Sequence, residues 1–389
     1  MQTLLSKLLT DSDIEDSSRL IGKVNGNRKS PTIIVFAGIH GNENAGVIAL
    51  ENIIQKIEEE NISFRGNFYA IKGNLKALKS NKRFEDVDLN RIWTRSKVHK
   101  LLDTNSKFSE IEEQKSIYKH IKDILYFNNG PFYFLDLHTT SSNTEPFITI
   151  SDSLNIRKFT SKFTLPVILG IEEYLEGPLL TYLNEFGHIS LGFEAGQHDD
   201  EASIINCESF VWVALVKSGC VRIKSLKNYK DYKAILHSNK PSDFYQINYK
   251  YQITKDEEFT MLEGFHNFQQ IKKGQLLAIS DGKKIEADRD GLIFMPLYQN
   301  KGDDGFFIIS KVSKFWLFLS RVLRKLGLYQ ILRLLPGVKK ASHYTLRVNP
   351  KTARFLSTKI FHLFGYRKRV KRGERLYFTK RDRKITPMH

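Results

Sequence analysis

His40 and Glu43 are side chains whose types and spacing could hold a metal ion. They lie three residues apart in His-Gly-Asn-Glu, directly after an apolar run over residues 31–38. Histidine nitrogens and carboxylate oxygens both bind zinc in proteins. Taken alone the pair indicates little, because this spacing occurs by chance in many chains. Gly41 lies between them, and we expect it to let the backbone turn tightly enough for both side chains to face one point.

His138 is the third candidate ligand. It follows a second apolar run, residues 131–137, and precedes a polar segment. Two histidines and one glutamate form the ligand set of several catalytic zinc sites, in which a fourth position is left for water. Asp136 could accept a hydrogen bond from a ligand histidine, or it could be a structural aspartate. The alternative for the whole group is two hydrogen-bonded histidines at strand ends, with no metal.

The apolar runs before both histidines predict strands of an α/β fold. Short runs rich in β-branched and aromatic residues, bounded by glycine or polar residues, are typical of buried strands. They occur at 31–38, 66–71, 131–137, 147–150, 166–171 and 189–193. Helical spacing or composition predicts helices at 45–60, 111–127, 152–163, 175–186 and 200–217. Such alternation predicts a sheet with helices on both faces, and ligands bind at the carboxyl ends of strands in such sheets.

The pattern of the sequence changes near residue 243. Residues 244–254 alternate as in a half-buried strand, and further short strands follow at 276–285, 291–296 and 306–310, separated by Gly and Asp turns. We therefore divide the chain into a zinc-binding catalytic α/β domain (1–224), a small β-rich domain (225–310) and a basic, partly amphipathic C-terminal extension (311–389).

Four short motifs resemble those of the succinylglutamate desuccinylase/aspartoacylase family, a branch of the zinc carboxypeptidase-like fold. They are GIHGNE at 38–43, RFEDVDLNR at 83–91, LDLH at 135–138 and GFEAGQ at 192–197, in the family's order and with similar spacing. The resemblance covers residues 31–310, including MPLY and GDDGFFI in the β-rich part. It implies a mixed sheet flanked by helices, followed by a small β-rich C-terminal domain, and it leaves out the basic tail.

The resemblance also implies a role for each matching residue. One zinc ion per chain would be bound by His40, Glu43 and His138. Glu194 would be the general base and acid, and Arg83 would stabilise the negative charge of the tetrahedral intermediate. Asn90 and Arg91 would bind the carboxylate of the substrate, since a planar guanidinium can bond both of its oxygens.

Two positions depart from the family pattern. Members that cleave N-acetylaspartate carry a further arginine shortly before the catalytic glutamate, where this chain has Asn184. A substrate-binding tyrosine from the β-rich domain has no direct match. Tyr298 is the candidate, within a shifted local pattern. We therefore expect the metal chemistry of the family without assigning N-acetylaspartate or N-succinylglutamate as the substrate.

Together these residues predict a zinc-dependent hydrolase, a deacylase that cleaves the amide bond of a small N-acyl amino acid or related compound. A zinc metallocarboxypeptidase acting on peptide ends would use the same metal site and is the nearest rival. A non-catalytic binding protein acting through its basic tail is a third alternative. The presence of every expected ligand, together with Glu194 and Arg83, argues against it.

The basic character of the chain is concentrated in its tail. The formal net charge is +17, and residues 311–389 hold 22 lysines and arginines against two acidic residues, Glu374 and Asp382. Three readings stay open. The segment around Trp316 could be an amphipathic helix whose arginines meet anionic lipid headgroups. The tail could contact nucleic acid, although it carries no recognisable nucleic-acid motif. It could also be a small appended domain with a solvated basic face.

Two further features concern the compartment. Cys207 and Cys220 lie in an apolar stretch outside any CxxC context, so we expect buried free thiols, which fit a reducing compartment. Residues 1–18 lack the continuous apolar core of a signal peptide, and no run of about 18 apolar residues occurs. We therefore expect a cytoplasmic protein, at most peripheral at the membrane surface.

Overall fold

The computed structural model describes residues 19–100, 107–237, 243–254, 256–299, 302–352 and 358–388. Residues 1–18, for which we expect no signal peptide, lie outside this part. The chain forms two compact units. The first holds residues up to 139 together with 198–235, and the second holds 140–197 together with the residues from 236 onward. Both contain parallel and antiparallel strands with helices packed on them, so the predicted α/β fold with a mixed sheet flanked by helices is confirmed.

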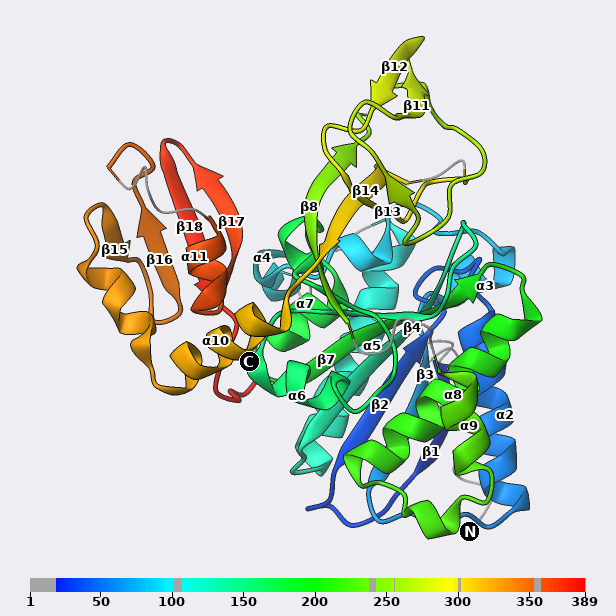
Figure 1. Ribbon diagram of the computed structural model, residues 1–389. Helices are drawn as coiled ribbons and strands as arrows, with labels where there is room; N and C mark the ends of the chain where they lie inside the picture. Colours follow the sequence, from blue (N-terminus) through cyan, green and yellow to red (C-terminus); the bar gives the residue numbers. More distant parts are fainter. Residues whose placement is uncertain are drawn as a thin grey trace. The chain divides into compact units, whose positions relative to one another are not determined.

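Four strands form the sheet of the first unit. Their order is β1 (Leu20–Val24), β3 (Asn67–Lys72), β2 (Thr32–Ala37) and β4 (Phe132–Thr140). β2 runs parallel to both of its neighbours, whereas β1 pairs antiparallel with β3 at the edge. Every residue of β2 is buried, as expected for a central strand with helices on both sides. Figure 1 shows these strands side by side.

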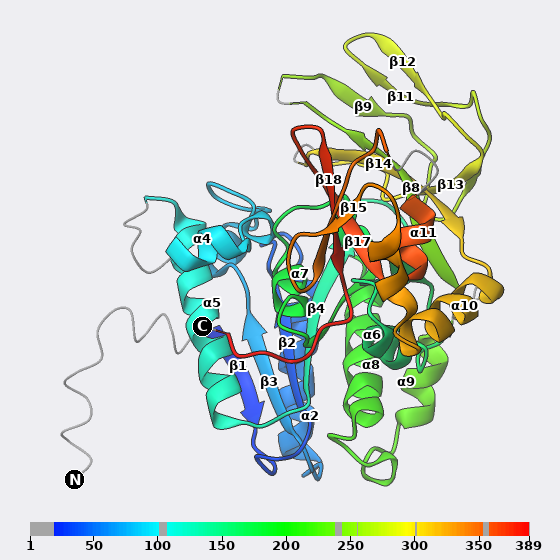
Figure 2. The same cartoon turned by 90° about the vertical axis from the view of Figure 1, so that its left-hand side faces the viewer.

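Helices cover both faces of this sheet. Figure 2 shows α5 (Ser109–Phe127) on one side and α8 (Glu201–Ser218) with α9 (Tyr229–Ile235) on the other. α2 (Ala45–Glu59) packs against α8. Short helical segments complete the unit: α3 (Leu75–Ser80), η1 (Leu89–Arg91), α4 (Arg95–Lys100) and η4 (Ile223–Ser225). Cys207 and Cys220 are buried free thiols, as predicted.

The second unit contains seven paired strands in one sheet. Their order is β7 (Ile189–Gln197), β5 (Phe147–Ile150), β6 (Val167–Leu169), β8 (Phe244–Gln252), β14 (Asp304–Lys311), β13 (Gly291–Phe294) and β10 (Gln270–Ile271). Residues between β8 and β13 also form a separate three-stranded sheet, in the order β12 (Lys283–Glu286), β11 (Leu276–Ser280) and β9 (Phe259–Met261). Between residues 140 and 197, this unit has the helical segments α6 (Leu154–Thr160), η3 (Ile171–Glu173) and α7 (Leu179–Asn184).

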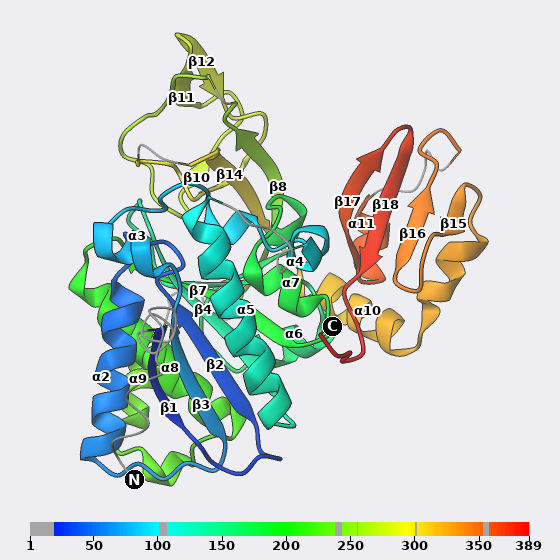
Figure 3. The same ribbon diagram turned by 180° about the vertical axis from the view of Figure 1, so that it is seen from behind.

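The C-terminal extension folds as a small module. It begins with α10 (Lys314–Lys325), which ends before Gly327 in the left-handed region, and continues with η5 (Leu328–Leu334). A four-stranded antiparallel sheet follows, with α11 (Thr358–Leu363) between its strands: β15 (Val338–Lys340), β16 (Thr345–Val348), β18 (Arg375–Lys380) and β17 (Tyr366–Arg372). Its core contains Leu332, Leu346, Phe361 and Phe378. Figure 3 shows the module in orange and red. The three-domain division at residues 224 and 310 stays a prediction.

Buried ion pairs attach this module to the α6 and η3 region of the same unit. The carboxylate of Asp152 accepts hydrogen bonds from Arg157 and Arg367 and lies 3.3 Å from Arg324. Burial alone would raise the pKa of Asp152, but these guanidiniums hold it well below its usual range. Because the partners come from α6, α10 and β17, the charge cluster fixes the module in place.

Among the described residues, no helix has the length and apolarity needed to span a bilayer.

Candidate metal centre

The register between β2 and β4 brings the two histidines together. Ala37 of β2 lies opposite Leu137 of β4 in the parallel pair. His138 is the next residue of β4, and His40 lies three residues beyond Ala37. Because parallel strands end at the same edge of a sheet, both imidazoles project from one edge. The imidazole ring centroids lie 5.2 Å apart.

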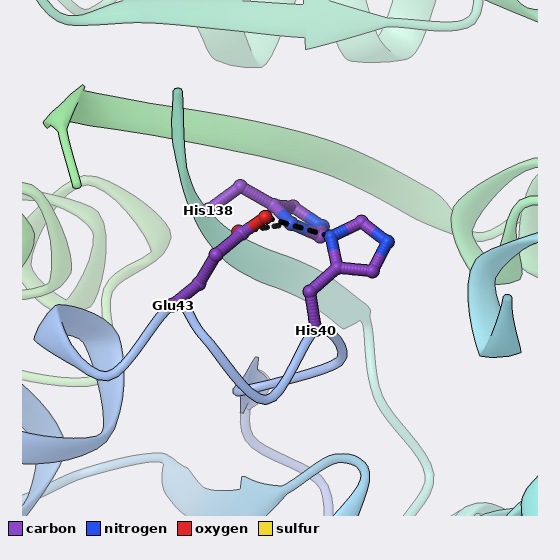
Figure 4. Close-up of side chains that lie close together, drawn as sticks. All are labelled: His40, Glu43 and His138. Carbon is purple, nitrogen blue, oxygen red and sulfur yellow. Dashed lines mark hydrogen bonds and ion pairs between the residues drawn. The ribbon is translucent and has the colours of Figure 1, made fainter. Parts of the chain in front are cut away.

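Glu43 completes the group by facing both imidazoles. Its Oε1 atom lies 2.7 Å from Nδ1 of His40, and its Oε2 atom lies 2.9 Å from Nδ1 of His138. Figure 4 shows the three side chains converging. One ligand atom from each of the three lies within 4.8 Å of the others, and all three residues are buried. The predicted metal-ligand residues are therefore brought together by the fold.

The far nitrogen of each imidazole has its own carboxylate partner. Nε2 of His138 lies 2.8 Å from Asp136, and Nε2 of His40 lies 3.2 Å from Asp88. Such contacts fix the ring orientation and leave Nδ1 as the atom that could bind a metal. The predicted contact of Asp136 with a ligand histidine is present. Asp88 has the same relation to His40 and was not singled out from the sequence, although it lies within the RFEDVDLNR motif.

The turn that carries His40 and Glu43 depends on two glycines in different ways. Gly38 adopts a positive φ of 70°, which favours glycine. Gly41 has no positive φ, and its expected part in letting the backbone turn stays a prediction. A Cβ at Gly41 would lie 2.0 Å from the carbonyl carbon of Ala77. Gly41 is thus required because the backbone of α3 passes close to the turn.

The electrostatics of the group keep Glu43 ionised. Burial raises the pKa of Glu43, but the adjacent imidazoles outweigh this and lower the pKa well below its usual range. Burial lowers the pKa of His138, yet Asp136 and Glu43 raise it well above the usual value. A metal cation must displace the proton on a ligand nitrogen. In exchange it would supply the positive charge that this buried carboxylate requires.

A second group of polar side chains lies beside the three candidate ligands. The guanidinium of Arg83 lies 3.7 Å from Oε1 of Glu43 and 3.2 Å from Oδ2 of Asp88. The backbone N–H of Asn90 donates to Asp88 at 2.8 Å, and Nη1 of Arg91 donates to the carbonyl of Asn90 at 3.1 Å. Burial raises the pKa of Asp88, but His40, Arg83 and Arg91 lower it to far below its ordinary value. The segment 83–91 therefore lies at the site with two cationic side chains.

The loop that carries Arg83 and Asp88 is held by one buried glutamate. The carboxylate of Glu110, at the start of α5, accepts hydrogen bonds from the backbone N–H groups of Glu85, Asp86 and Val87. It also accepts one from the side chain of Asn74 at 3.0 Å. Glu110 was not recognised in the sequence, because a glutamate in the first turn of an amphipathic helix is common and gives no local signal.

Known proteins resemble this chain in sequence and in fold. A succinylglutamate desuccinylase of Photorhabdus laumondii is 36% identical over 75 residues, which are 19% of this chain and only 22% of that protein. Another from Pseudoalteromonas atlantica is 24% identical over 280 residues, 68% of this chain and 76% of its own length. The solved structure of a Vibrio parahaemolyticus succinylglutamate desuccinylase has a TM-score of 0.55 at 17% identity, covering 74% of this chain and 84% of that one.

Residues 29–203 match the model of the succinylglutamate desuccinylase/aspartoacylase catalytic domain. This part of the chain belongs to the succinylglutamate desuccinylase/aspartoacylase family. The metal-ligand candidates, Arg83, Asn90, Arg91 and Glu194 all lie within the matched residues. The names of these desuccinylases and aspartoacylases denote enzymes that remove an acyl group. The matched region ends before the β-rich strands and the basic tail.

Glu194, the family's general base by motif, lies in the second unit. It is buried in β7, where it pairs with Phe147 of β5. Its part in the chemistry stays a prediction.

Asn184 is buried at the end of α7 in the same unit, and its amide donates to the carbonyl of His188 at 3.3 Å. The hydroxyl of Tyr298 donates to the carbonyl of Leu262 at 2.9 Å. The hydroxyl thus bonds to the backbone of the segment that follows β9, and contact of Tyr298 with a substrate stays a prediction.

His198, which lies near the candidate metal ligands, was not predicted from the sequence. The backbone N–H of Thr139 donates to Oε2 of Glu43 at 3.1 Å. The hydroxyl of the same threonine lies 2.7 Å from Nδ1 of His198. His198 is therefore linked to the candidate metal ligand Glu43 through a single residue, Thr139. Its position directly after the GFEAGQ motif of the family is the signal that could have identified it.

Proposed function

We propose that this chain is a zinc-dependent hydrolase that cleaves the amide bond of a small N-acyl amino acid or related compound. The convergence of Nδ1 of His40, Nδ1 of His138 and the carboxylate of Glu43 carries the proposal. Two imidazoles and one carboxylate form a donor set that suits zinc, and three protein ligands leave a coordination position open. Membership of a deacylase family supports the choice of a non-peptide amide as substrate.

A bound zinc ion would supply a Lewis acid and lower the pKa of a coordinated water to about 7. The residues of the chain would provide the other functions. Arg83 places a permanent positive charge beside Glu43, where it would stabilise negative charge developing on the substrate carbonyl oxygen. Asn90 and Arg91, in the same segment, would bind the carboxylate of the amino-acid portion. Glu194 would take a proton from the attacking water and deliver it to the leaving nitrogen.

The proposal is tested by metal analysis together with a hydrolysis screen. Purified protein should contain about one zinc per chain, held by the three ligands. It should release the free amine from some members of a panel of N-acetyl and N-succinyl amino acids, lose this activity with a chelator and regain it with zinc. Hydrolysis confined to C-terminal peptide bonds would favour the metallocarboxypeptidase instead. Absence of hydrolysis by the zinc-loaded protein across the panel and peptides would reject both enzymes.

Two variants separate the ligand set from the proton-transfer group. His138→Ala should abolish zinc binding and activity, whereas His99→Ala, on exposed α4, should change neither. Retention of stoichiometric zinc by His138→Ala would reject the ligand assignment. Glu194→Gln should keep its zinc and lose turnover by about 10²–10⁴-fold, the usual contribution of proton transfer. A rate near that of the unaltered enzyme would remove Glu194 from the mechanism.

A further inference from the structure

The first helix of the C-terminal module carries an apolar stripe along its length. Side chains spaced three and four residues apart lie on one face of a helix. In α10 and the residue that follows it, such a series consists of Phe315, Phe318, Leu319, Val322 and Leu326. In a helix of a folded domain, a stripe of this kind normally packs into the core.

The structure leaves every residue of this stripe outside the core: Leu319 and Val322 are half-buried, and the other three are exposed. The residues of α10 that are buried are polar: Ser320 donates its hydroxyl to the carbonyl of Leu363, and Arg324 bonds Asp152 and Asp382. The exposed fractions are 63% for Phe315, 61% for Phe318 and 67% for Leu326. Polar anchors thus fix the rotation of the helix about its axis. The fold leaves the aromatic side chains in contact with solvent.

Further exposed apolar side chains lie beside the stripe of α10 and in the segment that follows the helix. Trp316 is half exposed and packs edge-on against Phe315, with ring centroids 5.3 Å apart. Ile331 and Leu334, in the following η5, are also exposed. Exposed apolar clusters of this kind on soluble proteins mark sites of contact with another surface. The face of α10 formed by Phe315, Phe318, Val322 and Leu326 is hereafter called the α10 outer face.

Cationic residues border the α10 outer face. Lys314, Arg321 and Lys325 are exposed and spaced seven and four residues apart, so they lie along one edge of the stripe. The sequence contains no acidic residue from Lys311 to Gly373. The two acids that follow pair with other cations: Glu374 with Lys351, and Asp382 with the buried Arg324. The positive charge along this edge is therefore not neutralised by acids of the module.

This combination fits the boundary between lipid headgroups and acyl chains. Aromatic and aliphatic side chains on one face enter the interface, while lysines and arginines at its edge meet anionic headgroups. We propose that the α10 outer face docks on the surface of an anionic lipid membrane, with the helix lying in the plane of the interface. Phosphates of a nucleic acid would satisfy the lysines but would leave the apolar stripe exposed. The proposal does not depend on the proposed hydrolase activity.

Tryptophan fluorescence of the full chain tests the proposal directly. The chain has three tryptophans; Trp93 and Trp212 are buried, so only Trp316 is placed to respond to a surface. Vesicles of phosphatidylcholine and phosphatidylserine in a two-to-one mixture should shift the emission to shorter wavelength. Vesicles of phosphatidylcholine alone should give a weaker response, and added salt should reduce binding to the anionic vesicles. The shift should be absent from Trp316→Phe.

Cosedimentation with the same vesicles compares matched variants. Phe315→Ser with Phe318→Ser should weaken partitioning by at least roughly tenfold, because apolar burial drives interfacial binding. Phe127→Ser, at an equally exposed phenylalanine of α5, should leave it unchanged. The triple change of Lys314, Arg321 and Lys325 to Gln should remove the preference for phosphatidylserine. The same change at the exposed lysines Lys227, Lys230 and Lys233 should not.

Circular dichroism and thermal unfolding establish that each variant is folded before its binding is compared. Absence of binding to anionic vesicles by the unaltered chain would overturn the proposal. So would unchanged partitioning of a folded Phe315→Ser, Phe318→Ser variant. Concentration-dependent dimerisation that these two changes abolish, without vesicle binding, would assign the α10 outer face to a second copy of the chain and would also overturn it.

Discussion

The Nε2 atom of His40 lies 3.2 Å from Oδ1 of Asp88. The same carboxylate lies 3.2 Å from the guanidinium of Arg83 through its other oxygen. Asp88 therefore connects a metal-ligand candidate with the cation expected to act on the substrate. One carboxylate thereby positions both the candidate ligand imidazole and the guanidinium.

Asp88→Asn tests the first half of this role. The amide oxygen of asparagine can still accept the backbone N–H of Asn90, so the loop should be preserved, but the negative charge that supports His40 is lost. We expect zinc affinity to fall by roughly 10–100-fold, the usual effect of removing such a partner. Competition with a chromophoric chelator measures the affinity. Asp123→Asn, on the exposed side of α5, is the control, and an unchanged affinity in Asp88→Asn would show that His40 needs no carboxylate support.

Arg83→Gln tests the second half. The change removes the positive charge beside Glu43 but keeps a hydrogen-bond donor for Asp88. We expect kcat to fall by about 10²–10³-fold with zinc content unchanged, because the charge would act on the reacting carbonyl oxygen rather than on the metal. Steady-state kinetics and metal analysis of the same preparation provide the measurement. Loss of zinc together with activity would contradict this, since it would make Arg83 a support for the ligands.

Glu110→Gln tests how the loop 83–91 is positioned. A carboxylate accepts several N–H donors, whereas a glutamine turns one NH2 group toward them and leaves some of these part-buried donors without an acceptor. We expect a loss of about 1–3 kcal/mol in the free energy of unfolding. Hydrogen exchange at the amides of Glu85, Asp86 and Val87 should become faster. Urea unfolding and exchange measurements check this against Glu112→Gln, an exposed neighbour on α5, and equal protection in both variants would show that Glu110 does not hold the loop.

The central strands could be predicted from the sequence because they are buried on both faces. Their sequences are continuous apolar runs, without alternating polar residues, and glycine or polar residues mark their ends. The run 147–150 coincides with β5, and the run 31–38 differs from β2 only at its ends. The metal-ligand candidates followed from the same reasoning, since both histidines come directly after such runs. Because β2 and β4 are parallel neighbours, the side chains that follow their ends lie close together.

Elements with mixed or charged composition could not be predicted in this way. β1 (Leu20–Val24) is an edge strand that contains a glycine and a lysine, and β17 is dominated by basic residues. Asp88 and Glu110 act through contacts between residues distant in sequence, which a local pattern does not report. The orientation of α10 contradicts its own amphipathic pattern because buried partners of Arg324 outweigh the apolar stripe. Only the position of Asp152 and Asp382 in the fold reveals this.

Acid titration tests the ion pairs that hold the C-terminal module. Burial raises the pKa of Glu173, but Arg367 and His362 outweigh it and lower the pKa from 4.5 to about 2. A carboxyl group with a depressed pKa stabilises the fold above its unfolded value and loses this contribution as the pH falls through the folded value. Glu173→Gln should therefore lower the free energy of unfolding near neutral pH by up to roughly 3 kcal/mol. The difference from the unaltered chain should shrink between pH 4.5 and about 2.

Urea unfolding at a series of pH values measures this difference directly. Glu263→Gln, at an exposed glutamate of the same unit, is the control and should follow the unaltered chain at every pH. Deletion of the whole module is a poorer test, because it would leave the buried carboxylates of Asp152 and Glu173 without their cations. A Glu173→Gln deficit that stays constant down to the acid limit would show that the pairing with Arg367 and His362 does not stabilise the module.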